Sequence, residues 1–234
     1  MNWASGFVTQ VKPVVRMLYA ALASSSPGKS PHVYHKQIQL AMSWINNYLQ
    51  HIECHLAWLQ FAYFRHRCCL DFVVDAFPWG GGALLYKNNV YAEVFVLVWT
   101  KADELATGAK IGDPASQALW EAYMMLRCLC CWMVPGVTER GFVKIRRDAQ
   151  GLLAAFLNRS AKSQLLNRIV KEVALHLAKH LCSVETLHIW SEQNGHADLL
   201  SRLADPGDLH NCRRSWLFSL ECRTRQCVGM IRAW

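Results

Sequence analysis

An α/β fold is predicted for the middle of this 234-residue chain, over residues 71–203. The first observation is the order of segments: three β-prone runs come first, and helix-periodic and β-prone segments then alternate, as in a sheet covered by helices. The second observation concerns the carboxylates. Asp75, Asp148 and Asp198 each stand at an end of a predicted element, and Glu121 lies on the first predicted helix. The sequence therefore predicts a sheet with acidic side chains at its edge.

The first two strands are predicted around a glycine-rich segment. The apolar run of residues 71–74 ends at Asp75, the chain turns through residues 78–82 (PWGGG), and a second apolar run follows over residues 83–86. Two strands joined by a glycine-rich bend fit this pattern, with Asn88-Asn89 as the next turn. A carboxylate beside glycines suits a metal or phosphate site, because glycine lets a substrate backbone come close. For this stretch alone, a plain hairpin whose aspartate caps a turn is the simpler interpretation.

The remaining elements of this block follow in order. A third β-prone run is followed by a polar segment with two glycines, which is predicted to be a loop. Helical periodicity, a short strand and two further helices come next, and the block closes with a strand, a loop and a helix that begins near His196. These elements cover residues 91–99, 101–114, 115–132, 142–145, 152–157, 165–181, 186–190 and 191–195.

A small helical module is predicted ahead of the α/β domain, over residues 1–66. Apolar residues recur at helical spacing within residues 3–23 and 32–64, and the serine- and proline-rich residues 24–31 form a linker by composition. The α/β domain then spans residues 67–204. Residues 205–234 form a basic tail to which the sequence assigns no role.

The net charge of +8 comes from the two flanks of the chain. Residues 1–70 carry six basic side chains and one acidic, residues 71–204 carry 14 and 13, and residues 205–234 carry five and three. A basic flank beside an acid-bearing core suits a polyanionic substrate handled through metal ions. A positive surface kept for solubility explains the charge equally well.

The cysteines point to an intracellular protein, in the cytoplasm or nucleus, and not to a secreted one. Those at 68–69 and 128–131 lie in apolar stretches and are predicted to be reduced core residues. No apolar run is long enough to cross a bilayer, so no membrane partner is expected. Basic residues precede an apolar run within residues 12–24, as in a targeting segment, but Pro13 and the shortness of the run argue against one. A zinc site near the C-terminus is not favoured, because the spacing of its four candidate ligands matches no common zinc module. These candidates are His210, Cys212, Cys222 and Cys227.

Four segments of the middle block carry a family resemblance. They are residues 75–85 (DAFPWGGGALL), 118–122 (ALWEA), 148–150 (DAQ) and 188–203 (HIWSEQNGHADLLSRL). In this order they resemble a type 1 RNase H domain of the kind fused to reverse transcriptases in retroelements. The last segment is the most specific, because it is similar to the H-I-P-G-x-x-N-x-x-A-D-x-L-S-R ending of those domains.

Segments upstream are similar to the connection that joins a reverse transcriptase to its RNase H. They are residues 2–4 (NWA), 18–22 (LYAAL) and 31–37 (PHVYHKQ). On this basis the chain is expected to be a piece of a larger polyprotein, with the missing reverse transcriptase region as a further partner.

The resemblance implies an RNase H-like fold, with a mixed central sheet flanked by helices, and a metal-dependent nuclease. Such an enzyme hydrolyses the RNA strand of an RNA–DNA hybrid internally, with two Mg²⁺ or Mn²⁺ ions that stabilise the attacking and leaving oxygens. Asp75 would bridge both ions and Asp198 would hold the water-activating side. Glu121 and Asp148 would each complete the shell of one ion.

Three further residues receive roles from the resemblance. His188, on a mobile loop, would assist proton transfer or product departure. Gln150 and Asn194 would face the nucleic acid, where side-chain amides can read the 2′-hydroxyl that marks the RNA strand. No basic cluster lies between Asp148 and Asp198, so hybrid affinity is expected to depend on the flank. The residues of the flank expected to contribute are Lys29, Lys36, Arg65 and Arg67.

Two departures from the family pattern keep other hypotheses open. Arg146-Arg147 precedes Asp148 where a small or polar residue is usual, and Trp190-Ser191 replaces Pro-Gly. A guanidinium turned inward would pair with a carboxylate and compete with a metal ion. Strand alternation turns Arg147 away from Asp148, so Arg146 is expected to be the nearer competitor.

These departures favour a second hypothesis, a non-catalytic nucleic-acid-binding relic of a retroelement. A transposase or integrase of the same fold is a third, which the histidine-containing ending and the position of Glu121 on the first helix argue against.

Overall fold

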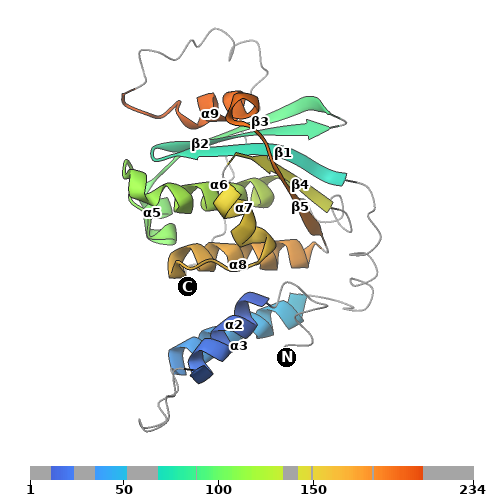
Figure 1. Ribbon diagram of the computed structural model, residues 1–234, viewed down its shortest axis with the longest axis vertical. Coiled ribbons are helices and arrows are strands. Elements are labelled where there is room, and N and C mark those ends of the chain that lie inside the picture. Colours follow the sequence, from blue (N-terminus) through green and yellow to red (C-terminus); the bar gives the residue numbers. More distant parts are fainter. Residues whose placement is uncertain are drawn as a thin grey trace.

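A mixed five-stranded sheet forms the centre of the molecule (Figure 1). The computed structural model describes residues 12–23, 35–51, 68–87, 89–133, 142–148, 150–180 and 182–207. The strands lie in the order β3-β2-β1-β4-β5, with β1, β2 and β3 antiparallel and β4 and β5 parallel to β1. This confirms the predicted α/β class and the predicted mixed central sheet. The strands are β1 (Cys68–Phe77), β2 (Gly80–Lys87), β3 (Val90–Val98), β4 (Phe142–Arg147) and β5 (Ser183–His188).

Helices cover both faces of the sheet (Figure 1). One face carries α6, with α7 and α8 beyond it, and the other face carries the short helix α9. The helices and 3₁₀ turns of this domain are α5 (Lys101–Thr107), η2 (Pro114–Ser116), α6 (Gln117–Trp132), α7 (Gln150–Leu157), α8 (Gln164–Lys179), η3 (Ser191–Asn194) and α9 (Gly195–Ser201).

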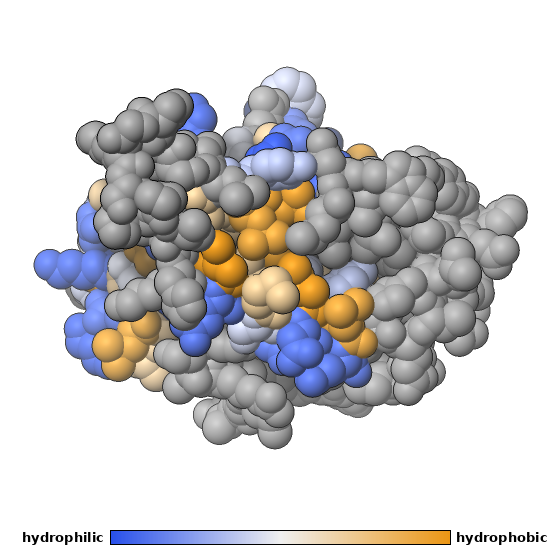
Figure 2. Space-filling view, turned by 90° about the horizontal axis from the view of Figure 1, so that it is seen from below, coloured by the Kyte–Doolittle hydropathy of each residue, from blue (hydrophilic) through white to orange (hydrophobic). Residues whose placement is uncertain are grey.

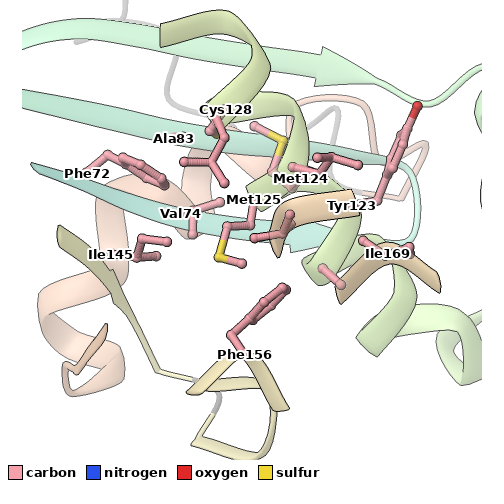
Figure 3. Close-up of a cluster of buried hydrophobic side chains, with 14 of the residues drawn as sticks. Phe72, Val74, Ala83, Tyr123, Met124, Met125, Cys128, Ile145, Phe156 and Ile169 are labelled. Atoms are coloured by element: carbon pink, nitrogen blue, oxygen red, sulfur yellow. The ribbon is translucent and has the colours of Figure 1, made fainter. Parts of the chain in front are cut away.

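The main hydrophobic core lies between the sheet and α6, α7 and α8. Phe72 and Val74 of β1 face Met124 and Met125 of α6, and Phe156 of α7 closes the cluster from the far side (Figure 3). Because α6 lies between the sheet and α8, most of its circumference is buried. Burial of each large side chain stabilises the fold by roughly 1.5–3 kcal/mol, so α6 is the main packing element of the domain.

Two N-terminal helices pack against the outer side of α8 (Figure 1). They are α2 (Lys12–Ala23) and α3 (His35–His51). Val14, Trp44 and Tyr48 form a second apolar cluster with Leu175 and Ala178 of α8. Helix α8 therefore joins the two clusters.

Part of this N-terminal layer remains apolar at its surface. Tyr19 of α2 and Leu40, Met42 and Leu49 of α3 are exposed. Apolar residues also gather in the described part of the face seen from this side of the molecule (Figure 2). Among the described residues, no helix has both the length and the apolar composition that a bilayer span needs.

Several sequence predictions lie outside the described residues. These are the linker over residues 24–31, the helical segment beyond His51, and the tail beyond Gly207 with its four residues weighed for zinc. Of the cysteines predicted to be core residues, Cys128 and Cys131 are buried on α6 but Cys130 is exposed. The helix turns Cys130 away from the sheet, because consecutive helical positions point in different directions.

The segment predicted to be a loop over residues 101–114 instead begins with helix α5. The side chain of Thr100 accepts a hydrogen bond from the backbone N–H of Asp103, and the carboxylate of Asp103 accepts one from the backbone N–H of Thr100. This reciprocal capping box starts the helix. Gly108, at a φ of 73°, ends it. Because the segment is polar, it lacks the apolar periodicity by which a helix is predicted, although its capping residues are present in the sequence.

The three glycines predicted to form a bend belong to strand β2, and the turn itself consists of Pro78 and Trp79. These glycines allow the protein's own helices to come close to the sheet. A Cβ atom on Gly81 would lie 2.5 Å from the sulfur of Met124 on α6. A Cβ atom on Gly82 would meet α9, 2.8 Å from both the carbonyl oxygen of Ala197 and the backbone nitrogen of Ser201. Glycine here lets helices approach the sheet on both faces.

We expect Gly82→Ala to destabilise the protein by about 2 kcal/mol, because the added methyl group forces α9 away from β2. Gly151→Ala on α7 is the matched control, since a Cβ atom there meets nothing within 4 Å. The control should leave stability unchanged or slightly raised. Urea unfolding of both variants makes the comparison, and equal stabilities would contradict this account of Gly82.

Candidate active site

Asp75 lies at the centre of the candidate site, near the end of β1 and opposite Gly82 of β2. It is 8% exposed. The hydroxyl group of Ser201 donates a hydrogen bond to its Oδ2 atom at 2.7 Å, and the amide of Asn194 donates one to Oδ1 at 3.3 Å. Helix α9 and the preceding turn η3 therefore orient this carboxylate.

The carboxylates of Asp148 and Asp198 affect the pKa of Asp75. The pKa of Asp75 is raised to about 6: burial is the main cause and the negative charges of Asp198 and Asp148 add to it, while the hydrogen bond from Ser201 and the positive charge of Arg147 act in the opposite direction. Asp148 follows β4, and Asp198 lies on α9. Asp75, Asp148 and Asp198, here called the acidic cluster, are thus brought together from three separate elements.

The outer members of the acidic cluster have their own donors. The hydroxyl group of Ser191 lies 3.4 Å from Oδ2 of Asp148. Nε of Arg202 donates to Oδ1 of Asp198 at 2.8 Å, one helical turn along α9. The guanidinium of Arg202 also lies over the ring of Phe77, 4.5 Å from its centroid. Because Asp198 and Arg202 are both partly exposed, this ion pair can open to another cation at little cost.

Glu121 is paired with Arg147 and Gln117. Nη2 of Arg147 donates to Oε2 of Glu121 at 2.7 Å, and Nε2 of Gln117 lies 3.1 Å from Oε1. Gln117 also donates to the carbonyl oxygen of Ala76, at 2.5 Å. Both carboxylate oxygens of Glu121 therefore already accept hydrogen bonds.

The expectation that Arg146 would be the nearer competitor is wrong. Arg147 does turn away from Asp148, but it turns to the face that α6 covers, following the buried Val143 and Ile145. That face is the one from which Glu121 projects. Arg146 lies on the other face and pairs with Asp71. Strand alternation predicts the face to which Arg147 turns, but not the helix that packs against that face.

The other three predicted site residues lie on β5, η3 and α7. His188 is the last residue of β5 and not part of a loop; it is exposed, with its ring 5.5 Å from that of Trp190. Asn194 is 1% exposed and its amide donates to Asp75; its contact with a nucleic acid stays a prediction. Gln150 begins α7, two residues after Asp148.

Sequence reasoning overlooked two residues that orient the carboxylates. Ser201 follows Asp198 by three positions and Gln117 precedes Glu121 by four, so each lies one helical turn from a predicted site residue. That spacing was a usable signal. It identifies neighbours on one helix face, although it does not reveal that Ser201 reaches Asp75.

The acidic cluster fits a divalent cation, and Glu121 does not. Among the residues that the structure describes, no three His, Cys, Asp or Glu side chains come close enough together to hold a metal ion by themselves. Mg²⁺, however, commonly binds through one or two carboxylates and keeps waters and substrate phosphates as its other ligands. The mutually repulsive charges at Asp75 favour a cation there, whereas the oxygens of Glu121 are already engaged.

Comparison with known proteins gives matches among solved structures. No protein-family model and no curated protein matches the chain. The chain is similar to LC11-RNase H1, isolated from compost by a metagenomic approach, with 16% identity and a TM-score of 0.46 over 60% of this chain and 97% of that one. It is also similar to RNase H1 from the halophilic archaeon Halobacterium salinarum NRC-1, with 14% identity and a TM-score of 0.42 over 58% of this chain and 96% of that one. These superpositions are loose, so the chemistry proposed below rests on the side chains of the site.

The raised pKa of Asp75 predicts that stability falls as pH rises. The unfolded aspartate titrates near pH 4 and the folded one at about pH 6. Its contribution is therefore fully present below about pH 4 and is lost as pH rises through about 6, a change of roughly 2–3 kcal/mol. Asp75→Asn should remove this loss and gain stability over the native protein between pH 4 and pH 7. Urea unfolding without divalent ions measures it, and parallel pH profiles for the two proteins would contradict the prediction.

Proposed function

We propose that this chain is an RNase H-type endoribonuclease that cuts the RNA strand of an RNA–DNA hybrid with Mg²⁺ or Mn²⁺. The observation that carries the proposal is the acidic cluster. Three carboxylates that lie far apart in the sequence come near enough for Asp148 and Asp198 to raise the pKa of Asp75, and two hydrogen-bond donors orient this central carboxylate. A site of this kind suits phosphodiester hydrolysis, in which negative charge builds up on the phosphate oxygens.

Each residue of the site has a task in this proposal. Asp75 and its neighbours Asp148 and Asp198 would hold a divalent cation. When bound, that cation supplies positive charge to the scissile phosphate and lowers the pKa of a bound water. Ser201 and Asn194 fix the orientation of the Asp75 carboxylate. His188 is exposed at the end of β5, where it can accept or donate a proton without a rearrangement of the core.

The origin and extent of the domain complete the proposal. The order of the four sequence segments supports a domain over residues 67–204 that derives from a retroelement polyprotein. Residues 1–66 would be part of the connection to a reverse transcriptase, and residues 205–234 a separate basic tail. The protein would act inside the cell, in the cytoplasm or nucleus, where RNA–DNA hybrids arise.

A second candidate function rests on one observation, the pair between Arg147 and Glu121. A carboxylate expected to bind a catalytic ion is instead engaged by a buried guanidinium. This favours a relic that binds nucleic acid without cutting it. The two candidates differ in turnover alone, so a cleavage assay separates them.

The proposed activity predicts that the full chain cuts a labelled RNA–DNA hybrid in Mg²⁺ or Mn²⁺ and leaves the DNA strand intact. Asp75→Asn should lower the rate by at least 100-fold, because the central carboxylate is lost, and EDTA should abolish cutting. Asp205→Asn, outside the acidic cluster, is the matched control and should cut at the native rate. Folded protein that binds the hybrid without cutting it would establish the relic instead.

A further inference from the structure

Arg147 is the most deeply buried charged group beside the site. Its side chain is 0% exposed, and its strand is paired on both sides, with β1 and with β5. The backbone carbonyl of Arg147 also accepts a hydrogen bond from the N–H of Ile189 at 2.9 Å. The backbone of Arg147 is therefore held within the sheet, and its side chain lies in the protein interior.

The guanidinium supplies what a metal ion would supply at Glu121. A guanidinium remains positively charged in proteins. It contacts Oε2 of Glu121 at 2.7 Å, while Gln117 occupies Oε1. A divalent ion would have to displace both donors to reach this carboxylate. It would also have to approach a buried positive charge, and the repulsion between two cations is stronger in the protein interior than in water.

Arg147 is not fully satisfied by this contact. Within the part of the chain that the structure describes, its Nε and Nη1 atoms have no hydrogen-bond partner. Unsatisfied buried donors are costly, so an arginine is a poor choice for packing alone. Its pair with Glu121 and the nearby negative charges of Asp75 and Asp148, rather than its packing, account for a charge at this point of the core.

We propose that the guanidinium of Arg147 is a built-in replacement for the cation beside Glu121, so that this site takes a single divalent ion, at the acidic cluster. The inference rests on the proposed function for the identity of the site. The family resemblance implies two divalent ions, and this inference replaces one of them with the guanidinium of Arg147. Asp75, with a neighbouring carboxylate of the acidic cluster, holds the ion together with water or substrate phosphate, and Glu121 serves to hold Arg147.

The number of bound Mn²⁺ ions tests this inference directly. The full chain is titrated with Mn²⁺ alone, and the free ion is followed by its electron paramagnetic resonance signal. We expect one ion per chain in the native protein, and its loss in Asp75→Asn. Glu121→Gln should keep one ion with its dissociation constant changed less than twofold. Arg147→Met should bind a second ion, and adding Glu121→Gln to that variant should remove it.

Arg146→Met is the matched control, because it removes a positive charge from the neighbouring position on the same strand. It should still bind one ion, since Arg146 pairs with Asp71 and not with Glu121. Two ions or none in the native protein would overturn the inference, and so would a tenfold loss of affinity in Glu121→Gln. Should Arg147→Met fail to fold, the native protein and Glu121→Gln still decide the question. A count of one ion without hybrid cleavage would leave this inference standing and overturn the proposed activity.

Discussion

The close approach of helix α9 to strand β2 at Gly82 is the constraint on which the site depends. Gly82 lies opposite Asp75 in the sheet, so a helix seated on this glycine brings its own side chains over the carboxylate. Ser201 and Asn194 then reach Asp75, and Asp198 adds its charge nearby. A side chain at position 82 would keep all three away. The glycines that suggest a substrate-binding bend in the sequence instead make room for the protein's own helix.

On the opposite face of the sheet, helix α6 makes the second essential contact, between Glu121 and Arg147. Buried ion pairs seldom stabilise a fold, because both charges lose their hydration. This pair also leaves two donors of Arg147 unsatisfied among the described residues. The arrangement therefore has a cost that apolar packing would avoid. Its effect is to place a positive charge near enough to the acidic cluster to act on Asp75, and under the proposed function such a charge lessens the need for a second metal ion.

Much of the fold and part of the site could be predicted from the sequence, because strands and amphipathic helices each have a characteristic spacing of apolar residues. The five strands and the helices α6 to α9 follow from periodicity, and the positions of Asp75, Asp148 and Asp198 at element ends follow from their place in it. The partner of Arg147 could not be predicted, because it depends on which helix packs against which face. The burial of Asn194 has the same cause, since η3 lies against β1. Helix α5 was hidden by its polarity, although its capping residues Thr100 and Asp103 were visible.

We infer that one cation binds at the acidic cluster while the guanidinium of Arg147 remains paired with Glu121. Anomalous diffraction from crystals of the full chain grown in Mn²⁺ locates bound ions without reference to activity. We predict one anomalous peak, within coordinating distance of Asp75, and the contact between Arg147 and Glu121 intact. A peak coordinated by Glu121, with Arg147 displaced, would contradict the account.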